Sequence, residues 1–556
     1  MKKTLFFAVA IVMILTSCGG KLGALSADNF KVDPNPLEAE GGQVQATING
    51  MFPEQYMNRK AVITVTPELR FMKNGMQQAV KGSSATFQGE KVMGNDQTIS
   101  YLLGGHYTMK TSFPYEAAMQ QSNLYLTFDA RLGNKAVKVP AVKIAEGVIA
   151  TSELYHMTLK GVQPCVAQDD FQRVTEEKYD ANIKFLIQQA ELRKSELQSN
   201  SVQDFVKLLQ QIARDKEGLN LSNVEISAYA SPDGGVKLNE KLANQRQQNT
   251  ESYVRQQMKD ANVEGGVSSE YTAQDWEGFQ ELVKASNIPD KDVILRVLSM
   301  YQDPQEREQQ IKNMSKGFKE LADGILPELR RARMTINYEV IGRDDEQIFE
   351  QYKKDASKLS VEELIYAAII APTTSEKEDI LKTTTKLYPK DARSYNNLAV
   401  LAMQEGKQEE ARAFLQQVQQ LPEANANLGL LALQAGDIKT AEKYISQSAG
   451  AYGLASILGN LHLAQGNYAL AQKDFGYTPS NSAALAQLQN KDYARALQTL
   501  KNVKEKDGIT DYLMAIVNAR QGNNEAAASS LRSALQKDPS LKSYADKDLE
   551  LRNISK

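Results

Sequence analysis

The residues whose types best suit ligand binding form the polar loop Ser231-Pro232-Asp233-Gly234-Gly235. Proline fixes φ and glycine tolerates positive φ, so this composition predicts a tight turn. A turn followed by a helix presents backbone N–H groups and the positive end of the helix dipole, which suits a carboxylate. The alternative is that Pro-Asp-Gly is simply a turn and binds nothing.

The residues around the loop predict the elements that must position it. Apolar and polar residues alternate from Val224 to Tyr229, which is typical of a strand with one buried face. After the loop, Leu238, Leu242 and Val254 recur at helical spacing. The order is therefore strand, tight polar loop and helix.

The stretch from Val224 to Met258 resembles the centre of the OmpA-like peptidoglycan-binding domain. That family has a short strand, a loop usually reading T-D-x-x-G, and a helix with Y-N-x-x-L-S-x-x-R-A. Gly234 falls on the loop glycine, Asn239 on the asparagine and Arg246 on the arginine. The resemblance implies that Arg246 and a loop carboxylate hold the diaminopimelate of the wall peptide. Ser231 stands at the family's aspartate position, and Asp233 follows two residues later.

The resemblance therefore identifies Ser231, Asp233, Asn239 and Arg246 as candidate peptidoglycan-binding residues. In this hypothesis Arg246 and the N–H groups of the loop meet a peptide carboxylate, and Asp233 meets the amino group. In the structural alternative, Arg246 lays its stem on the core and pairs with Asp233.

The OmpA-like domain is expected to span residues 169–345. Residues 181–190, followed by residues 191–193, resemble the family's first strand and its entry into a helix, and residues 331–338 resemble its last strand. An amphipathic helix is predicted over residues 204–213. The insertion from Asp275 to Leu326 contains Trp276, the only tryptophan, which we interpret as a core or groove anchor. The segment resembles OmpA-like domains of Bacteroidetes lipoproteins.

The N-terminus predicts export. Lys2 and Lys3 precede an apolar run that is shorter than a typical membrane-spanning helix and is typical of a signal peptide. The run ends in Leu15-Thr16-Ser17-Cys18-Gly19, which resembles a bacterial lipobox; this implies cleavage after residue 17 and lipidation of Cys18. Residues 18–29 are then a linker. Surface-exported lipoproteins of Bacteroidetes usually carry acidic residues just after the cysteine, and here the first is Asp28, so the resemblance implies the periplasmic face of the outer membrane. The alternative is an ordinary secretory peptide with an incidental cysteine.

Residues 30–160 are predicted to form a β-sandwich, with immunoglobulin-like architecture as the expected form. Short apolar or alternating runs are separated by clusters of Gly, Asn and Asp. The expected strands are residues 44–48, 61–65, 98–103, 107–113 and 124–128.

Residues 346–556 are predicted to form a TPR-like helical solenoid. Gly406, Gly436, Gly466 and Gly522 each precede an alanine by five residues, and Lys491 does the same. The interval is somewhat below the roughly 34 residues of a tetratricopeptide unit. A small residue in each helix is expected to let the helix pair close, and about five or six stacked pairs would present a concave surface to partner proteins. The alternative is an α-helical bundle without repeat order.

Composition excludes several function classes. The net charge of -3 gives no basic field for nucleic acid. Three histidines and two cysteines are scattered, so no metal cluster, cofactor site or catalytic constellation can be assembled, and no enzyme is expected. Once Cys18 carries lipid, Cys165 has no disulfide partner.

The sequence thus predicts a non-enzymatic scaffold lipoprotein of the outer membrane. It would bind envelope proteins through the repeats, the membrane through its lipid, and peptidoglycan through the OmpA-like domain. Two alternatives stay open. One is an accessory subunit of an outer-membrane assembly or secretion complex whose OmpA-like domain no longer binds peptidoglycan. The other uses that domain only as a docking surface.

Overall fold

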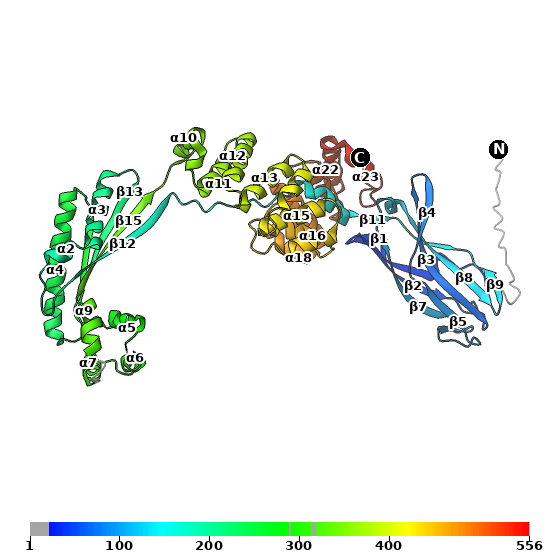
Figure 1. The fold of residues 1–556 in the computed structure, drawn as a ribbon. Helices are drawn as coiled ribbons and strands as arrows, with labels where there is room; N and C mark the ends of the chain where they lie inside the picture. The colour runs from blue at the N-terminus through cyan, green and yellow to red at the C-terminus, as the bar shows by residue number, and fades with distance from the viewer. Residues whose placement is uncertain (1–21, 289–290, 314–318, 555–556) are drawn as a thin grey trace, which may run out of the picture. The chain divides into compact units, whose positions relative to one another are not determined.

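The computed structural model describes residues 22–288, 291–313 and 319–554. It divides into two compact units (Figure 1). Unit 1 combines residues 1–168 with residues 368–556, and unit 2 comprises residues 169–367. Unit 2 is therefore an insertion in the sequence of unit 1. Cys18 and the predicted signal peptide lie outside the described residues.

The N-terminal part of unit 1 consists of two sheets that enclose one hydrophobic core. The first sheet has the order β11 (Val148–Ile149), β1 (Phe30–Glu40), β2 (Gln43–Phe52), β7 (Gly105–Pro114). The second has the order β10 (Val142–Glu146), β8 (Asn123–Leu132), β3 (Ala61–Lys73), β5 (Ala85–Gly89), β6 (Gln97–Ile99), with β4 (Met76–Lys81) on β3 and β9 (Lys135–Lys138) on β8. Buried residues alternate along β2, β3 and β7, as expected for strands with one inward face.

One predicted strand is wrong in its extent. Residues 98–103 were expected to be extended, but β6 ends at Ile99 and a turn follows, closed by the bridge between Ser100 and Gly104. Leu102 and Leu103 are 60% and 80% exposed, so their apolar character does not report a buried strand.

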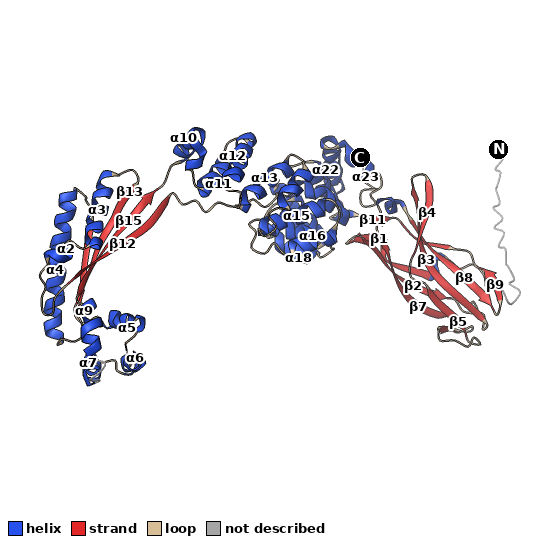
Figure 2. Ribbon diagram, viewed as in Figure 1, coloured by secondary structure: helices blue, strands red, loops and turns tan. Residues whose placement is uncertain are grey.

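The C-terminal part of unit 1 is a series of helix pairs (Figure 2). The pairs are α13 (Ala392–Gln404) with α14 (Gln408–Leu415), α15 (Pro422–Gln434) with α16 (Ile438–Ile445), α17 (Leu454–Ala464) with α18 (Tyr468–Phe475), α19 (Asn481–Gln489) with α20 (Tyr493–Asn502), and α21 (Gly508–Arg520) with α22 (Asn524–Lys537). Helix α12 (Thr374–Leu387) precedes them and the short α23 (Lys542–Ala545) follows.

The repeating glycines have a different role from the one predicted. They lie in the turn between the helices of a pair, where φ is +76° to +78°, and Lys491 has the same left-handed conformation. In each turn two backbone N–H groups satisfy the last carbonyls of the first helix, as in Gly436 N–H to Leu433 O and Asp437 N–H to Ala432 O. The repeating alanines do pack as expected, because Ala411, Ala441 and Ala471 are fully buried in the second helices.

Unit 2 contains one sheet in the order β12 (Val174–Lys184), β15 (Arg331–Ile341), β13 (Leu219–Tyr229), β14 (Gly266–Thr272). Only the β13–β14 pair is parallel. Helices α3 (Asn200–Arg214) and α4 (Val236–Ala261) share a core with the sheet, and Figure 1 shows them beside it. The expected first strand was misplaced, because β12 begins at Val174 and ends at Lys184, whereas the short helix α2 (Lys194–Leu197) begins directly after residues 191–193.

The insertion within unit 2 has its own small hydrophobic core. It contains α5 (Trp276–Ala285), α6 (Lys291–Met300), α7 (Pro304–Asn313) and α9 (Leu326–Leu329). Trp276 packs against this core, edge-on to Phe279, as predicted for an anchor. After β15 come α10 (Asp345–Asp355) and α11 (Val361–Ile370). Among the described helices, none has the length and apolar content needed to span a membrane.

Candidate functional site

The loop from Ser231 to Gly235 joins β13 to α4 and lines a pocket of about 80 Å³ in unit 2. All four residues predicted from the sequence line this pocket, namely Ser231, Asp233, Asn239 and Arg246. The lining is completed by Ile187, Gln188, Ala230, Gly234, Leu238, Leu242 and Arg330. The fold thus brings the predicted residues together around one cavity.

Arg246 is 1% exposed and donates its hydrogen bonds to backbone carbonyls. Its Nε donates to Gln189 O at 3.0 Å, and its Nη1 donates to Tyr229 O at 2.8 Å. The guanidinium also lies over the Phe185 ring, 4.9 Å from its centroid. Arg246 therefore ties the end of β13 to the segment after β12, whatever else it binds.

Asp233 pairs with Arg330 and not with Arg246. Arg330 Nη2 lies 3.2 Å from Asp233 Oδ2, and Arg330 Nε donates to Ser231 Oγ at 3.3 Å. The Ser231 hydroxyl in turn donates to Asp233 Oδ1. The expected Arg246–Asp233 pair is therefore wrong, because Arg330, the residue directly before β15, pairs with Asp233 instead.

Asn239 holds the loop in shape. Its Nδ2 atom donates to Ser231 O at 2.8 Å and to Gly234 O at 2.9 Å. Both donors of the amide are used on the loop backbone, so Asn239 positions the pocket and is not free to donate to a ligand.

The pocket has an apolar margin. Ile187 and Leu238 line it and are 59% and 46% exposed. Leu186, next to Ile187, and Val236, two residues before Leu238, are 45% and 39% exposed. A ligand here meets buried charge below and apolar side chains at the edge.

A second constellation lies in unit 1, where two asparagines bind the backbone of an extended segment. Asn427 Oδ1 accepts from Cys165 N–H at 2.7 Å, and Asn427 Nδ2 donates to Cys165 O at 2.8 Å. Asn397 forms the same pair of bonds with Ala167, both at 2.9 Å. Two successive helix pairs therefore each bind the backbone of one residue, and these two residues, Cys165 and Ala167, are two positions apart in the extended segment.

The asparagines occupy one repeat position. Asn397, Asn427 and Ser482 each lie nine residues before the turn residue of their pair, on the first helix. Ser482 Oγ donates to Thr158 Oγ1 at 2.8 Å, so residues 158, 165 and 167 meet the fourth, second and first pairs. The segment therefore runs antiparallel to the order of the repeats. We call residues 150–167 the clasp segment.

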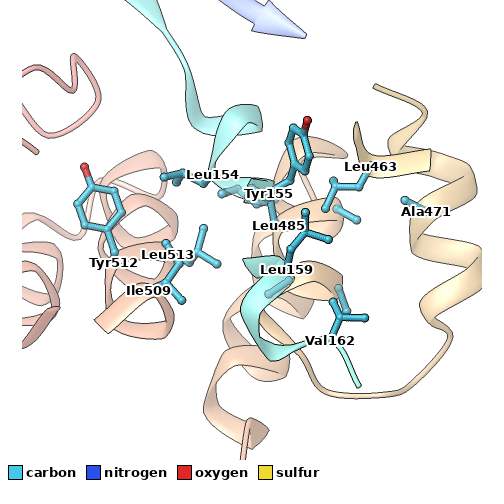
Figure 3. Close-up of a cluster of buried hydrophobic side chains, with 14 of the residues drawn as sticks. Leu154, Tyr155, Leu159, Val162, Leu463, Ala471, Leu485, Ile509, Tyr512 and Leu513 are labelled. Carbon is cyan, nitrogen blue, oxygen red and sulfur yellow. The ribbon is translucent and has the colours of Figure 1, made fainter. Parts of the chain in front are cut away.

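Apolar side chains of the clasp segment complete the core of the repeats. Figure 3 shows Leu154, Tyr155, Leu159 and Val162 among side chains of the solenoid helices. Leu154, Leu159 and Cys165 are each at most 2% exposed. The surface formed by the first helices was expected to be open to partners. That expectation is wrong, because the chain's own clasp segment fills this surface.

Residues at the C-terminal end of unit 1 contact Ala150, the first residue of the clasp segment. Tyr544 donates its hydroxyl to Ala150 O at 2.8 Å, and Arg520 pairs with Glu550 at 2.6 Å. Tyr512 donates to the buried carboxylate of Asp548 at 2.8 Å. Burial, and then the Glu550 charge, raise the pKa of Asp548 to about 6.

The N-terminal sheets also touch the repeats directly. Gly41 in the β1–β2 turn has φ +56°, and a Cβ there would lie 2.8 Å from the carbonyl oxygen of Gln465. Only glycine allows this approach of two backbones.

Sequence reasoning missed Arg330 and the clasp segment. The Asn-Asn-Leu-Ala and Asn-Ala-Asn-Leu-Gly stretches contain Asn397 and Asn427 at matching repeat positions, which was the available signal. In the described ranges, no three His, Cys, Asp or Glu side chains are grouped so that they could hold a metal ion.

Comparison with known proteins identifies one part of the chain. No curated protein matches it. A tetratricopeptide repeat protein from Parabacteroides merdae is 16% identical, covering 44% of this chain and 100% of its own, with a TM-score of 0.27. Yeast Tom70 is 11% identical, covering 64% of this chain and 83% of its own, with a TM-score of 0.24. Residues 392–425 match the tetratricopeptide repeat family, whose repeats generally mediate protein–protein interactions.

Proposed function

We propose that the protein is a non-enzymatic lipoprotein of the outer membrane that links the cell wall to envelope proteins. In this proposal unit 2 is an OmpA-like domain that binds peptidoglycan in the pocket of Ser231, Asp233 and Arg246. The observation that supports it is the convergence of the four predicted residues, with the buried guanidinium of Arg246, on one cavity. Cys18 would carry the lipid, the N-terminal sheets would be an immunoglobulin-like spacer, and the chain would face the periplasm.

The wall-binding proposal is tested by pelleting the full chain with purified sacculi. Leu238→Glu places a negative charge at the pocket margin, where it repels a wall carboxylate without entering the core, because Leu238 is 46% exposed. Val293→Glu is the matched control, since Val293 is 49% exposed and does not line the pocket. We expect Leu238→Glu to abolish pelleting and Val293→Glu to retain it. A wild-type chain that stays in the supernatant would rule out wall binding.

Partner proteins are proposed to contact the repeats outside the filled inner surface. Tyr452 and Tyr477 occupy equivalent repeat positions, fourteen residues before the turn residues, and are 68% and 96% exposed. Exposed aromatic side chains are common anchors of protein interfaces. Cross-linking in native membranes, compared between wild type and a Tyr452→Ser/Tyr477→Ser variant, tests this surface. Retention of every cross-linked partner by the variant would place the contact elsewhere.

The competing proposal is an accessory subunit of an outer-membrane assembly or secretion complex that does not use the wall pocket. It is favoured by the Asp233–Arg330 pair, which occupies the loop carboxylate. Co-purification with a β-barrel protein, together with absent sacculus pelleting, would select this alternative.

A further inference from the structure

The pocket of unit 2 contains more positive than negative charge. Arg246 and Arg330 line it together with a single carboxylate, that of Asp233. The Arg330–Asp233 pair is largely buried, with side chains 12% and 19% exposed. Lys312, whose Nζ donates to Asp233 O at 3.3 Å, is balanced by its own pair with Glu308. Among the described residues Arg246 forms no salt bridge, although the nearby Asp233 carboxylate favours its charged form through space.

This arrangement makes burial of the positive charge of Arg246 unfavourable. Within the described residues its hydrogen bonds reach carbonyl oxygens, and the Asp233 carboxylate is bonded to other groups. Burial, and then the neighbouring Arg330, lower the pKa of Arg246 to about 10, so it remains charged at neutral pH. A buried cation without a paired anion is unfavourable, and an anion in the pocket would relieve it.

The pocket offers an ammonium group no partner equivalent to the one that Arg246 offers a carboxylate. Asp233 Oδ1 already accepts from Ser231 and Oδ2 from Arg330. A ligand ammonium beside this carboxylate would also lie beside the Arg330 guanidinium, and like charges at such separations repel. The pocket therefore discriminates between a carboxylate and the zwitterionic end of an amino acid.

We propose that this pocket binds a terminal carboxylate whose neighbouring nitrogen belongs to an amide, as in the last D-alanine of a wall peptide, and that Arg330 excludes the zwitterionic end of diaminopimelate. The exposed Ile187 and Leu238 side chains suit the methyl group next to such a carboxylate. The inference rests on the proposed wall binding, and it specifies which chemical group of the wall peptide is bound.

The test is competition against sacculus pelleting of the full chain in mild detergent. The probes are N-acetyl-D-alanyl-D-alanine, its C-terminal amide, and meso-diaminopimelate. We expect the free acid to release the protein at concentrations at least tenfold below those of the amide and of diaminopimelate. Stronger competition by diaminopimelate would overturn the inference while leaving wall binding intact. A chain that does not pellet at all would overturn wall binding itself, and the inference with it.

Arg330→Gln tests the excluding residue. Removal of the guanidinium frees the Asp233 carboxylate, so we expect weaker competition by the free acid, stronger competition by diaminopimelate, and a reversed preference. Arg333→Gln removes the same charge three residues later, in β15 and outside the pocket lining, and should leave the preference unchanged. An unchanged preference in a folded Arg330→Gln protein would refute the role of Arg330. The wild-type comparison decides the ligand class even where Arg330→Gln fails to fold.

Discussion

The side-chain amide of Asn427 satisfies both backbone groups of Cys165, with bonds of 2.7 Å and 2.8 Å. Asn427 is fully buried and Cys165 is 2% exposed, so water cannot replace either bond. The amide binds the backbone and makes no demand on the side chain at residue 165. The repeats therefore bind the clasp segment through hydrogen bonds to its extended backbone, and burial of its apolar side chains stabilises the contact further.

Asn427→Ala is expected to destabilise unit 1 by about 1–3 kcal/mol, because it leaves the buried Cys165 N–H without a partner, whereas Cys165 O keeps the bond from Asn396 Nδ2 at 3.0 Å. Chemical denaturation followed by circular dichroism measures the change. Asn524→Ala is the control, since Asn524 is exposed at the start of α22 and its loss should cost less than about 0.5 kcal/mol.

Alkylation of Cys165 reports release of the clasp segment in the same variant. Burial raises the pKa of the Cys165 thiol to about 12, so the native thiol should resist alkylation at pH 8. Faster alkylation in Asn427→Ala than in Asn524→Ala is expected. Equal rates would mean that Asn427 does not hold the segment.

Gly436→Ala is expected to destabilise the repeats through backbone conformation alone. Gly436 has φ +77°, and a Cβ there would meet only open space. A left-handed non-glycine residue costs about 1–2 kcal/mol, partly offset by the lower chain entropy of unfolded alanine. Thermal melting should show a loss of about 1 kcal/mol, whereas Lys491→Gly, at an equivalent turn, should be neutral or stabilising. A stabilised Gly436→Ala would contradict the turn geometry.

Asp548→Asn is expected to stabilise unit 1 at neutral pH and to have no effect near pH 4. The folded pKa of about 6 lies above the ordinary aspartate pKa of 3.8, so the folded state binds the proton more tightly. Stability is then greatest at low pH and falls as pH rises through this window, by about 2–3 kcal/mol in all. Asparagine keeps an acceptor for the Tyr512 hydroxyl and removes the buried charge. Melting temperatures at pH 4 and pH 7.5 measure the effect, with the exposed Asp129→Asn as control. A variant less stable than wild type at pH 7.5 would show that the ionised carboxylate is needed.

Cys18→Ala is expected to leave the protein unlipidated and in the soluble fraction. The reason is that the thiol of Cys18 would be the acylation site in the lipobox-like Leu15-Thr16-Ser17-Cys18. Membrane fractionation and intact-mass measurement test this, and protease added to intact cells tests the periplasmic orientation. A variant that pellets like wild type without acyl chains would contradict the lipid anchor.

Local patterns predicted much of the fold but not its long-range pairings. The buried alternation of Val224, Ile226 and Ala228 identified β13 because a half-buried strand has a period of two residues. Strand β1 was missed because Pro34 and Pro36 count against a strand; the structure places them between Asp33 and Glu38, where the pairing with β2 shifts register.

In the candidate site, too, local patterns predicted the residues that are close in sequence but not the long-range contacts. The loop and Arg246 lie within one strand–loop–helix stretch and were found together. Arg330 is 97 residues from Asp233 in the sequence, and no local period links them. The clasp was missed for the same reason, since 262 residues separate Cys165 from Asn427.

The clasp segment also affects how the chain can fold during its synthesis. Its partners Asn427 and Ser482 are synthesised 262 and 324 residues later, after the whole of unit 2. Until then Leu154, Leu159 and their neighbours have no core to enter, and contacts of such high sequence separation form slowly. The unfinished chain therefore exposes an apolar segment during synthesis, and we expect holding chaperones to bind it. Any truncation before the last repeats would leave that segment uncovered, so loss of solubility in such a fragment would say nothing about partner binding.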